Sequence, residues 1–150
     1  MAHQFFPTIK VREKAFELFE HTADIGIRVR GKSQQDLFRN AGLALFQISA
    51  EKLPGSNNEK HKIIITQKAN DIEELFVNWL NELLSLSAAE GLVFEEIQIN
   101  NITEQLVEAV AVGSDVKNYK LNTEIKAATY HELKVRKGSP FWMAEVILDV

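Results

Sequence analysis

Hydrophobic and polar residues alternate in two short stretches near the N-terminus and predict a pair of β-strands. The first strand covers residues 15–20 and the second covers residues 25–30, where the apolar side chains fall on alternate positions. Gly31 ends the second strand. Residues 33–49 then carry apolar side chains at helical spacing and predict a helix with one buried face.

The middle of the chain repeats this order of strand and helix. Pro54-Gly55 and Asn57-Asn58 mark a loop over residues 51–60, and residues 62–67 predict a strand. A second helix follows over residues 71–89. Its apolar positions cover more than one stripe, which predicts a central helix, and Gly91 ends it. Each helix begins with a polar residue followed three positions later by an acid, which indicates N-terminal capping (Ser33 with Asp36, Asp71 with Glu74).

The last third of the chain reads as strands. Residues 92–100 and 105–112 are two strands around an Asn-rich turn, and residues 113–122 form a polar connection. A final hairpin pairs residues 124–135 with 141–148 around a turn over 136–140. We therefore expect one α+β domain over residues 15–150, largely antiparallel, with two helices and an internal duplication as one interpretation. Residues 1–14 are expected to be a poorly ordered extension.

Composition narrows the functional classes. The chain has 150 residues, of which 45% are hydrophobic and 25% charged, as is usual for a globular domain. Its net charge of −4 argues against a broad nucleic-acid footprint, although it leaves room for a small basic patch. The absence of cysteine excludes disulfides and thiolate metal sites, and it is compatible with a cytoplasmic protein. No apolar run approaches the roughly 20 residues that a membrane helix needs.

The final residues of the chain place two anionic groups together. Asp149 follows an apolar strand directly, and Val150 carries the α-carboxylate of the chain as given. Two carboxylates one residue apart repel each other unless a cation lies between them. The alternative interpretation is a solvated terminal aspartate.

Two further clusters carry chemically versatile side chains. Residues 20–24, Glu-His-Thr-Ala-Asp, lie between the first two strands. They are either a turn in which Thr22 and Asp24 bond the local backbone, or a site in which Asp24 faces an ion and His21 orients a ligand or carries a proton.

Residues 126–131, Lys-Ala-Ala-Thr-Tyr-His, read as a strand whose small alanines allow another backbone or a ligand to come close. Lys126 is either a solvated lysine or a functional one. His131 is either a half-buried structural residue or a ligand.

Motifs for common cofactors and nucleophiles are absent from the sequence, including the P-loop, GxGxxG, HExxH, GxSxG and EF-hand patterns. The four histidines are scattered, so a zinc site is not expected. Any bound metal would be held mainly by carboxylates, which favours Ca²⁺, Mg²⁺ or Mn²⁺.

Together these pieces resemble the archease family. The resemblance rests on EHTADIGI at residues 20–27, GKSQQDLFRNAGLALF at 31–46, LFVNWLNELL followed by AEGLVF, KAATYH at 126–131 and the final LDV, in this order. It extends from about residue 16 to residue 150. Two departures are Glu20, where the family usually has Asp, and Val150, where Ile is commoner.

The resemblance implies an accessory protein, not an enzyme, which activates an RtcB-type ligase for tRNA splicing or RNA repair. Archeases support guanylylation of the ligase and its multiple turnover, so contact with RNA and GTP would be indirect, through the ligase. The implied metal ligands are Asp24, Asp149 and Val150, holding a divalent cation for which Ca²⁺ is expected first. Lys126 is implied at the same functional tip, where we also expect His21 and His131.

Two rival hypotheses remain at this stage. The first is a metal-dependent phosphoester hydrolase that uses His21 or His131 as its general base. The second is a chaperone-like modulator of RNA-modifying enzymes that needs no metal. Turnover of phosphoesters by the chain alone would favour the first, and partner binding that survives a chelator would favour the second.

Overall fold

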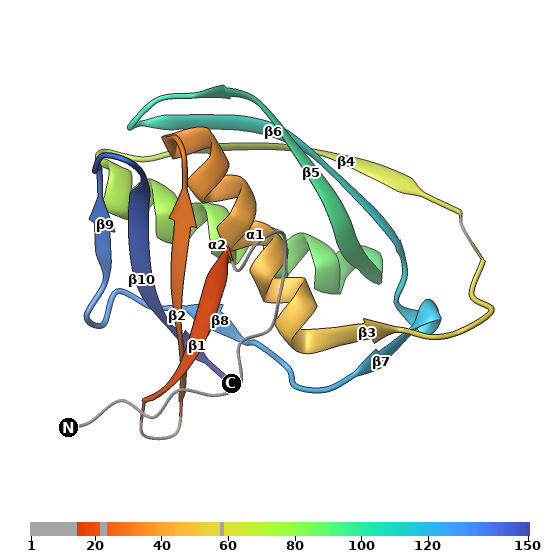
Figure 1. Cartoon of the computed structure of the whole chain (residues 1–150). Coiled ribbons are helices and arrows are strands. Elements are labelled where there is room, and N and C mark those ends of the chain that lie inside the picture. The colour runs from red at the N-terminus through yellow and green to blue at the C-terminus, as the bar shows by residue number, and fades with distance from the viewer. Residues whose placement is uncertain (1–14, 22–23, 58) are drawn as a thin grey trace.

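A computed structural model describes residues 15–21, 24–57 and 59–150 of the chain, and the predicted extension over residues 1–14 lies outside them. In Figure 1 the helices lie between sheets. The elements are β1 (Phe16–His21), β2 (Asp24–Gly31), α1 (Gln34–Ser49), β3 (Ala50–Lys52), β4 (His61–Lys68), α2 (Ile72–Glu90), β5 (Leu92–Ile102), β6 (Leu106–Asp115), a 3₁₀ turn (Val116–Asn118), β7 (Tyr119–Leu121), β8 (Ala127–Ala128), β9 (Lys134–Arg136) and β10 (Trp142–Asp149).

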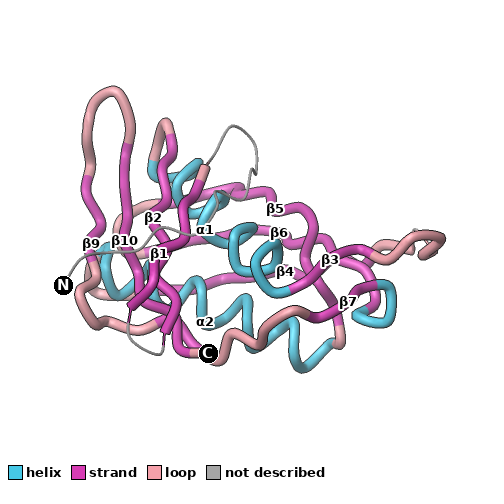
Figure 2. Tube along the Cα trace, turned by 60° about the horizontal axis from the view of Figure 1, so that its bottom comes forward, coloured by secondary structure: helices cyan, strands magenta, loops and turns pink. Residues whose placement is uncertain are grey.

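The strands form three antiparallel sheets. The largest has the order β1-β2-β10-β8, with β9 also paired to β10; the second has the order β4-β6-β5, and β3 pairs with β7. Both helices lie between the two larger sheets (Figures 1 and 2), as expected for a central second helix. The predicted α+β class with largely antiparallel strands is confirmed. No helix in the described part of the chain is long and apolar enough to cross a membrane.

The core forms because alternate strand positions and one face of each helix turn inward. In the large sheet, Ala144 and Val146 of β10 lie opposite Val29 and Ile27 of β2, and all four are buried. Trp79 of α2 is fully buried, and its indole N–H donates to the Phe38 carbonyl of α1 at 2.8 Å. That bond satisfies the buried indole donor.

Both helices start in the same way. Ser33 and Asp71 are extended N-caps whose side chains accept from Asp36 N–H and Glu74 N–H. Each of these acids bonds the residue before the cap: Asp36 accepts from Lys32 N–H at 2.9 Å, and Glu74 accepts from Asn70 N–H at 3.0 Å. The predicted capping is thus confirmed, with the acid reaching one residue farther back than a capping box requires. The two halves of the chain share this strand-to-helix start.

Three details of the sequence prediction are wrong. The predicted loop over 51–60 begins with part of β3, and the predicted connection over 113–122 contains the end of β6 and all of β7, which pairs with β3. Residues 124–135 are not one strand, because Thr129 Oγ1 donates to the Ile147 carbonyl and Glu132 adopts a φ of 53°. The chain therefore turns after β8 and only returns to β10 as β9.

Gly31 joins β2 to α1 where the two backbones approach closely. A Cβ at this position would lie 2.3 Å from the Leu37 backbone nitrogen. Leu37 N–H donates to the Ser33 carbonyl at 2.9 Å within the first turn of α1, so this backbone is not free to move aside.

We expect Gly31→Ala to lower the free energy of unfolding by about 3 kcal/mol, because an added methyl group here meets backbone atoms. Urea denaturation would measure the change. Lys32→Ala is the matched control, since Lys32 is exposed and its loss should cost less than about 0.5 kcal/mol. Equal midpoints for the two variants would contradict the close approach.

Candidate functional site

The C-terminal end of β10 brings residues from four strands into one row. His21 pairs with Asp24 between β1 and β2, and Asp149 pairs with Ala127 between β10 and β8. The register of β2 with β10 runs to Ile25 opposite Leu148, and one further residue places Asp24 opposite Asp149. We call His21, Asp24, Asp149 and Ala127 the terminal row.

The two aspartates of the terminal row occupy neighbouring positions on β2 and β10. Directly opposed residues of an antiparallel pair project to the same face, with Cβ atoms about 4.5–5.5 Å apart. Ile25 and Leu148 turn toward the core, so Asp24 and Asp149 lie on the outer face of the sheet. Within the described part of the chain, neither carboxylate has an ion-pair or side-chain hydrogen-bond partner. A cation bound between them would relieve the repulsion of these like charges.

Lys126 and Val150 adjoin the terminal row. Lys126 N–H donates to the Asp149 carbonyl at 2.8 Å, and continuing this register places Lys126 opposite Val150. The Val150 side chain packs against the core while Lys126 is exposed. The backbone thus gathers Asp24, Asp149, Val150 and Lys126 at one end of the sheet; their roles remain predictions.

The two histidines predicted at this tip lie at different places in the backbone. The backbone of His21 ends β1 in the terminal row, but its side chain, like Thr22 and Ala23, lies outside the described residues. His131 is not on a strand with Lys126, as predicted from the sequence, but in the exposed turn after β8, where its N–H donates to Thr129 Oγ1 at 3.3 Å. The turn takes His131 out of the terminal row.

The donor set at this end of the sheet suits a hard cation. No group of three His, Asp or Glu side chains that could hold a metal occurs among the residues that the structure describes. The predicted set needs only two such side chains, Asp24 and Asp149, because its third donor is a main-chain carboxylate at Val150. Oxygen donors of this kind match Ca²⁺, Mg²⁺ or Mn²⁺.

Comparison with known proteins decides the family. Residues 16–150 match the Archease protein family (MTH1598/TM1083). This chain belongs to the archease family. Among curated archeases, the protein from Methanosarcina barkeri is 36% identical over 143 residues, covering 91% of this chain and 97% of that protein. The archease of Pyrococcus abyssi is 34% identical over 143 residues, with 91% and 99% covered.

Solved structures agree with the archease fold. The solution structure of Methanobacterium thermoautotrophicum protein 1598 has a TM-score of 0.69 at 25% identity, covering 91% of this chain and 99% of that one. The crystal structure of a Thermotoga maritima protein, described as "an archease, possible chaperone", has a TM-score of 0.60 at 24% identity, covering 87% and 94%. The second likeness speaks for the fold alone.

Charged side chains cross the outer face of the same archease sheet. Glu17, Arg28, Glu145 and Lys134 lie opposite one another on successive strands. Arg28 hydrogen-bonds Glu145, and Lys134 lies 3.7 Å from it. Burial alone would raise the pKa of Glu145, but the hydrogen bond and charge of Arg28, with the charge of Lys134, lower it. The alternation of apolar and polar residues along β2 predicts that Arg28 faces outward. Only the strand register shows which charged side chains on neighbouring strands meet it.

A second ionic cluster lies at the other side of the molecule. Glu95 of β5 binds Lys52 at 3.0 Å and also pairs with Lys60, which ties the segment after β3 to the sheet. Burial would raise the pKa of Glu95, yet hydrogen bonds from Lys60, Tyr119 and Lys52 lower it to about 2. Burial and the Glu95 bond raise the pKa of Tyr119 to about 12. These groups are mutually satisfied, so they brace the fold.

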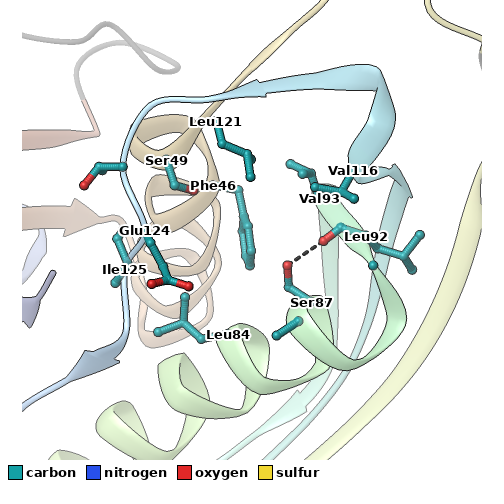
Figure 3. A pocket seen from close by; sticks show the side chains of 13 residues that line it. Phe46, Ser49, Leu84, Ser87, Leu92, Val93, Val116, Leu121, Glu124 and Ile125 are labelled. Atoms are coloured by element: carbon teal, nitrogen blue, oxygen red, sulfur yellow. Dashed lines mark hydrogen bonds between the residues drawn. The ribbon is translucent and has the colours of Figure 1, made fainter.

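A cavity of about 280 Å³ lies between the C-terminal ends of the two helices and the segment of residues 121–125 that precedes β8. Figure 3 shows Phe46 and Leu84 inside it, with Glu124 at its edge. The Ser87 hydroxyl donates to the Leu92 carbonyl and is therefore engaged. These walls are mostly apolar and offer no paired acid and base for hydrolysis.

Asn81 of α2 fixes the short strand β8 from behind. Its Nδ2 donates to the Ala128 carbonyl at 3.2 Å, and its Oδ1 accepts from Ala128 N–H at 2.7 Å. On the other side, Lys126 N–H and Thr129 N–H donate to carbonyls of β10. Asn81 thus replaces the missing neighbour strand of β8. The sequence places Asn81 on a helix but carries no signal for this contact.

We expect Asn81→Ala to lower the free energy of unfolding by about 2 kcal/mol, because it leaves the N–H and C=O of Ala128 without partners. Amide exchange at Ala128 should accelerate more than exchange in the β4–β6 pair. Asn78→Ala serves as the control on the same helix, since Asn78 makes one exposed bond of 3.4 Å to Lys68. If both variants behave alike, Asn81 does not anchor β8.

Proposed function

We propose that this archease is an accessory protein that activates an RtcB-type RNA ligase in the cytoplasm, promoting guanylylation of the ligase and its multiple turnover. One observation carries the proposal. Asp24 and Asp149 lie opposite each other on the outer face of the sheet end, with no cationic partner in the described part of the chain. Family membership supplies the context in which this arrangement is read.

In this proposal Asp24, Asp149 and the α-carboxylate of Val150 hold one divalent cation, Ca²⁺ first, with Mg²⁺ and Mn²⁺ as alternatives. Three carboxylates carry a charge of about −3, which a divalent ion reduces to about −1. When bound, the cation supplies positive charge suited to phosphate groups. Lys126 contributes a further positive charge next to Asp149.

The sheet supplies the rigidity that positioning needs. Asp24 is followed by Ile25, and Asp149 is preceded by Leu148. Both of these apolar residues pack into the core. Asp149 and Lys126 are exposed at the sheet end, where they can enter a partner's nucleotide pocket. Phosphoryl-type transfer depends mainly on position and charge compensation, which such a tip can improve. RNA and GTP would meet this chain through the ligase.

The metal-independent modulator is the second candidate. A Thermotoga maritima protein with this fold is described as a possible chaperone, and a role of that kind would need no metal. The hydrolase hypothesis has weaker support, because His131 lies in a turn outside the terminal row. Phosphoester turnover by the purified chain would restore it.

The carboxylates provide the first test of the activator proposal. Asp24→Asn and Asp149→Asn should each reduce multiple-turnover RNA ligation by at least about tenfold with an RtcB-type ligase from the same organism, GTP and divalent metal. Thermal stability should stay the same or rise slightly, because each change removes a repulsion. Glu104→Gln, an exposed acid between β5 and β6, is the control.

Three outcomes of this assay separate the candidates. Loss of activation in the two aspartate variants alone supports the cation tip. Activation that survives both substitutions and a chelator supports the metal-independent modulator. A wild-type chain that leaves the ligase unchanged overturns the activator proposal.

The position of the terminal carboxylate gives an independent test. Adding Gly-Ser after Val150 moves the α-carboxylate by about 7 Å while leaving every side chain in place. We expect this variant to lose activation as Asp149→Asn does and to keep the melting temperature of the unmodified chain. Full activation by the extended chain would remove Val150 from the ligand set.

A further inference from the structure

The end of the large sheet opposite the terminal row is positively charged. Strand β10 separates the two ends by seven residue steps from Trp142 to Asp149, about 23 Å at strand spacing. Figure 2 shows the loop between β9 and β10 projecting beyond the neighbouring strands, far from the C-terminus. Four cationic side chains and two aromatic rings lie at this end. We call this group the basic end (Arg30, Lys32, Arg136, Lys137, Phe141 and Trp142).

Sheet register brings Arg30, Lys32 and Arg136 to one face, and Lys137 follows Arg136 beside the Trp142 ring. Arg30 of β2 and Arg136 of β9 both lie opposite Met143 of β10, on its two sides. All three therefore project to the outer face of the sheet. Continuing the β2–β10 register by one residue places Lys32 opposite Phe141. Arg30, Lys32, Arg136 and Lys137 are all exposed.

Most of this positive charge is not neutralised. In the neighbouring row of the sheet the charges neutralise one another, because Arg28 pairs with Glu17 and Glu145, and Lys134 pairs with Glu145. Among the described residues, Lys32, Arg136 and Lys137 have no ion-pair partner, and Arg30 reaches Glu17 only at 3.9 Å.

One further acid lies close to the basic end. Asp36 accepts from the backbone N–H of Lys32 in the first turn of α1. The basic end thus keeps a positive excess in a chain of net charge −4.

Aromatic rings alternate with these cations. The Arg30 guanidinium lies 5.1 Å from the centre of the Phe141 ring, and Lys137 Nζ lies 5.9 Å from that of Trp142. Phe141 is 39% exposed, so part of its ring is accessible from solvent. Cations beside accessible rings are the combination that binds phosphate groups and stacks bases in single strands.

We propose that the basic end binds single-stranded nucleic acid directly. The four cations contact successive phosphates, and Phe141 stacks on a base once phosphate draws Arg30 from its ring. This goes beyond the proposed function, in which RNA is met only through the ligase. An acidic protein surface would satisfy the cations but would make no use of the exposed ring, which is why nucleic acid is favoured.

Binding can be measured without ligase or metal. A fluorescein-labelled oligouridylate of about 12 nucleotides would be titrated with the full chain in chelator, following anisotropy at about 50–200 mM salt. Each neutralised phosphate of a single strand contributes about −0.7 to the slope of log K against log salt, so four contacts predict a slope near −2.8.

Variants locate the site. Arg136→Gln with Lys137→Gln should weaken binding at least about tenfold and reduce the steepness of the salt slope by about 1.4. Lys62→Gln with Lys68→Gln removes the same charge from exposed positions on β4 and should change affinity less than about twofold. Phe141→Ala should weaken binding about fivefold or more with the slope unchanged, because stacking is not ionic. Thermal melts would confirm that the variants are folded.

Three results would overturn the assignment. One is no anisotropy change at about 50 mM salt with protein near 100 μM, the weak end of the range of about 10⁻⁴–10⁻⁶ M for non-specific dissociation constants. Another is an equal loss of RNA affinity in the variant with Arg136→Gln and Lys137→Gln and in the control variant with Lys62→Gln and Lys68→Gln. The third is displacement of the RNA by polyglutamate as effectively as by unlabelled RNA, which would assign the basic end to an acidic protein. None of these results bears on the ligase assay, which depends on the opposite end.

Discussion

The antiparallel register between β2 and β10 is the constraint on which the rest of the structure depends. It joins the first part of the chain to the last and places Arg30 opposite Met143; continued by one residue past Ile25 and Leu148, it places Asp24 opposite Asp149. A slip of one residue would turn every side chain of one strand to the other face. The buried pairs Ile27–Val146 and Val29–Ala144 make such a slip costly, because it would expose them and bury charges.

This register also gives the large sheet two different ends. One end carries opposed carboxylates beside the chain terminus, and the other carries uncompensated cations beside Phe141. A row of paired charges around Arg28 and Glu145 lies between them. Because helices cover only the inner face, the outer face offers both ends to partners at a fixed separation. A rigid two-ended surface suits an accessory protein, which acts by positioning other molecules.

Local features could be read from the sequence, while long-range ones could not. Both helices and their caps follow from nearby residues, as Ser33 and Asp71 demonstrate, and Gly91 ends α2 in the left-handed conformation. The break after β8 depends on a bond from Thr129 to Ile147, and β8 itself depends on Asn81, far away in sequence. Periodicity does not reveal such partners, so the sequence pattern places His131 on a strand and at the tip, whereas the structure places it in a turn. Asp24, Lys126 and Asp149 were named from short motifs, and the fold gathers their backbones; their roles rest on experiment.

The most direct test of the central claim is a crystal of the chain soaked in Mn²⁺ and measured at a wavelength where manganese scatters anomalously. The account predicts a single strong peak with carboxylate oxygens of Asp24 and Asp149 and the Val150 terminus within about 2.6 Å, lost in Asp149→Asn. Absence of a peak there, with the two aspartates turned apart into solvent, would contradict it.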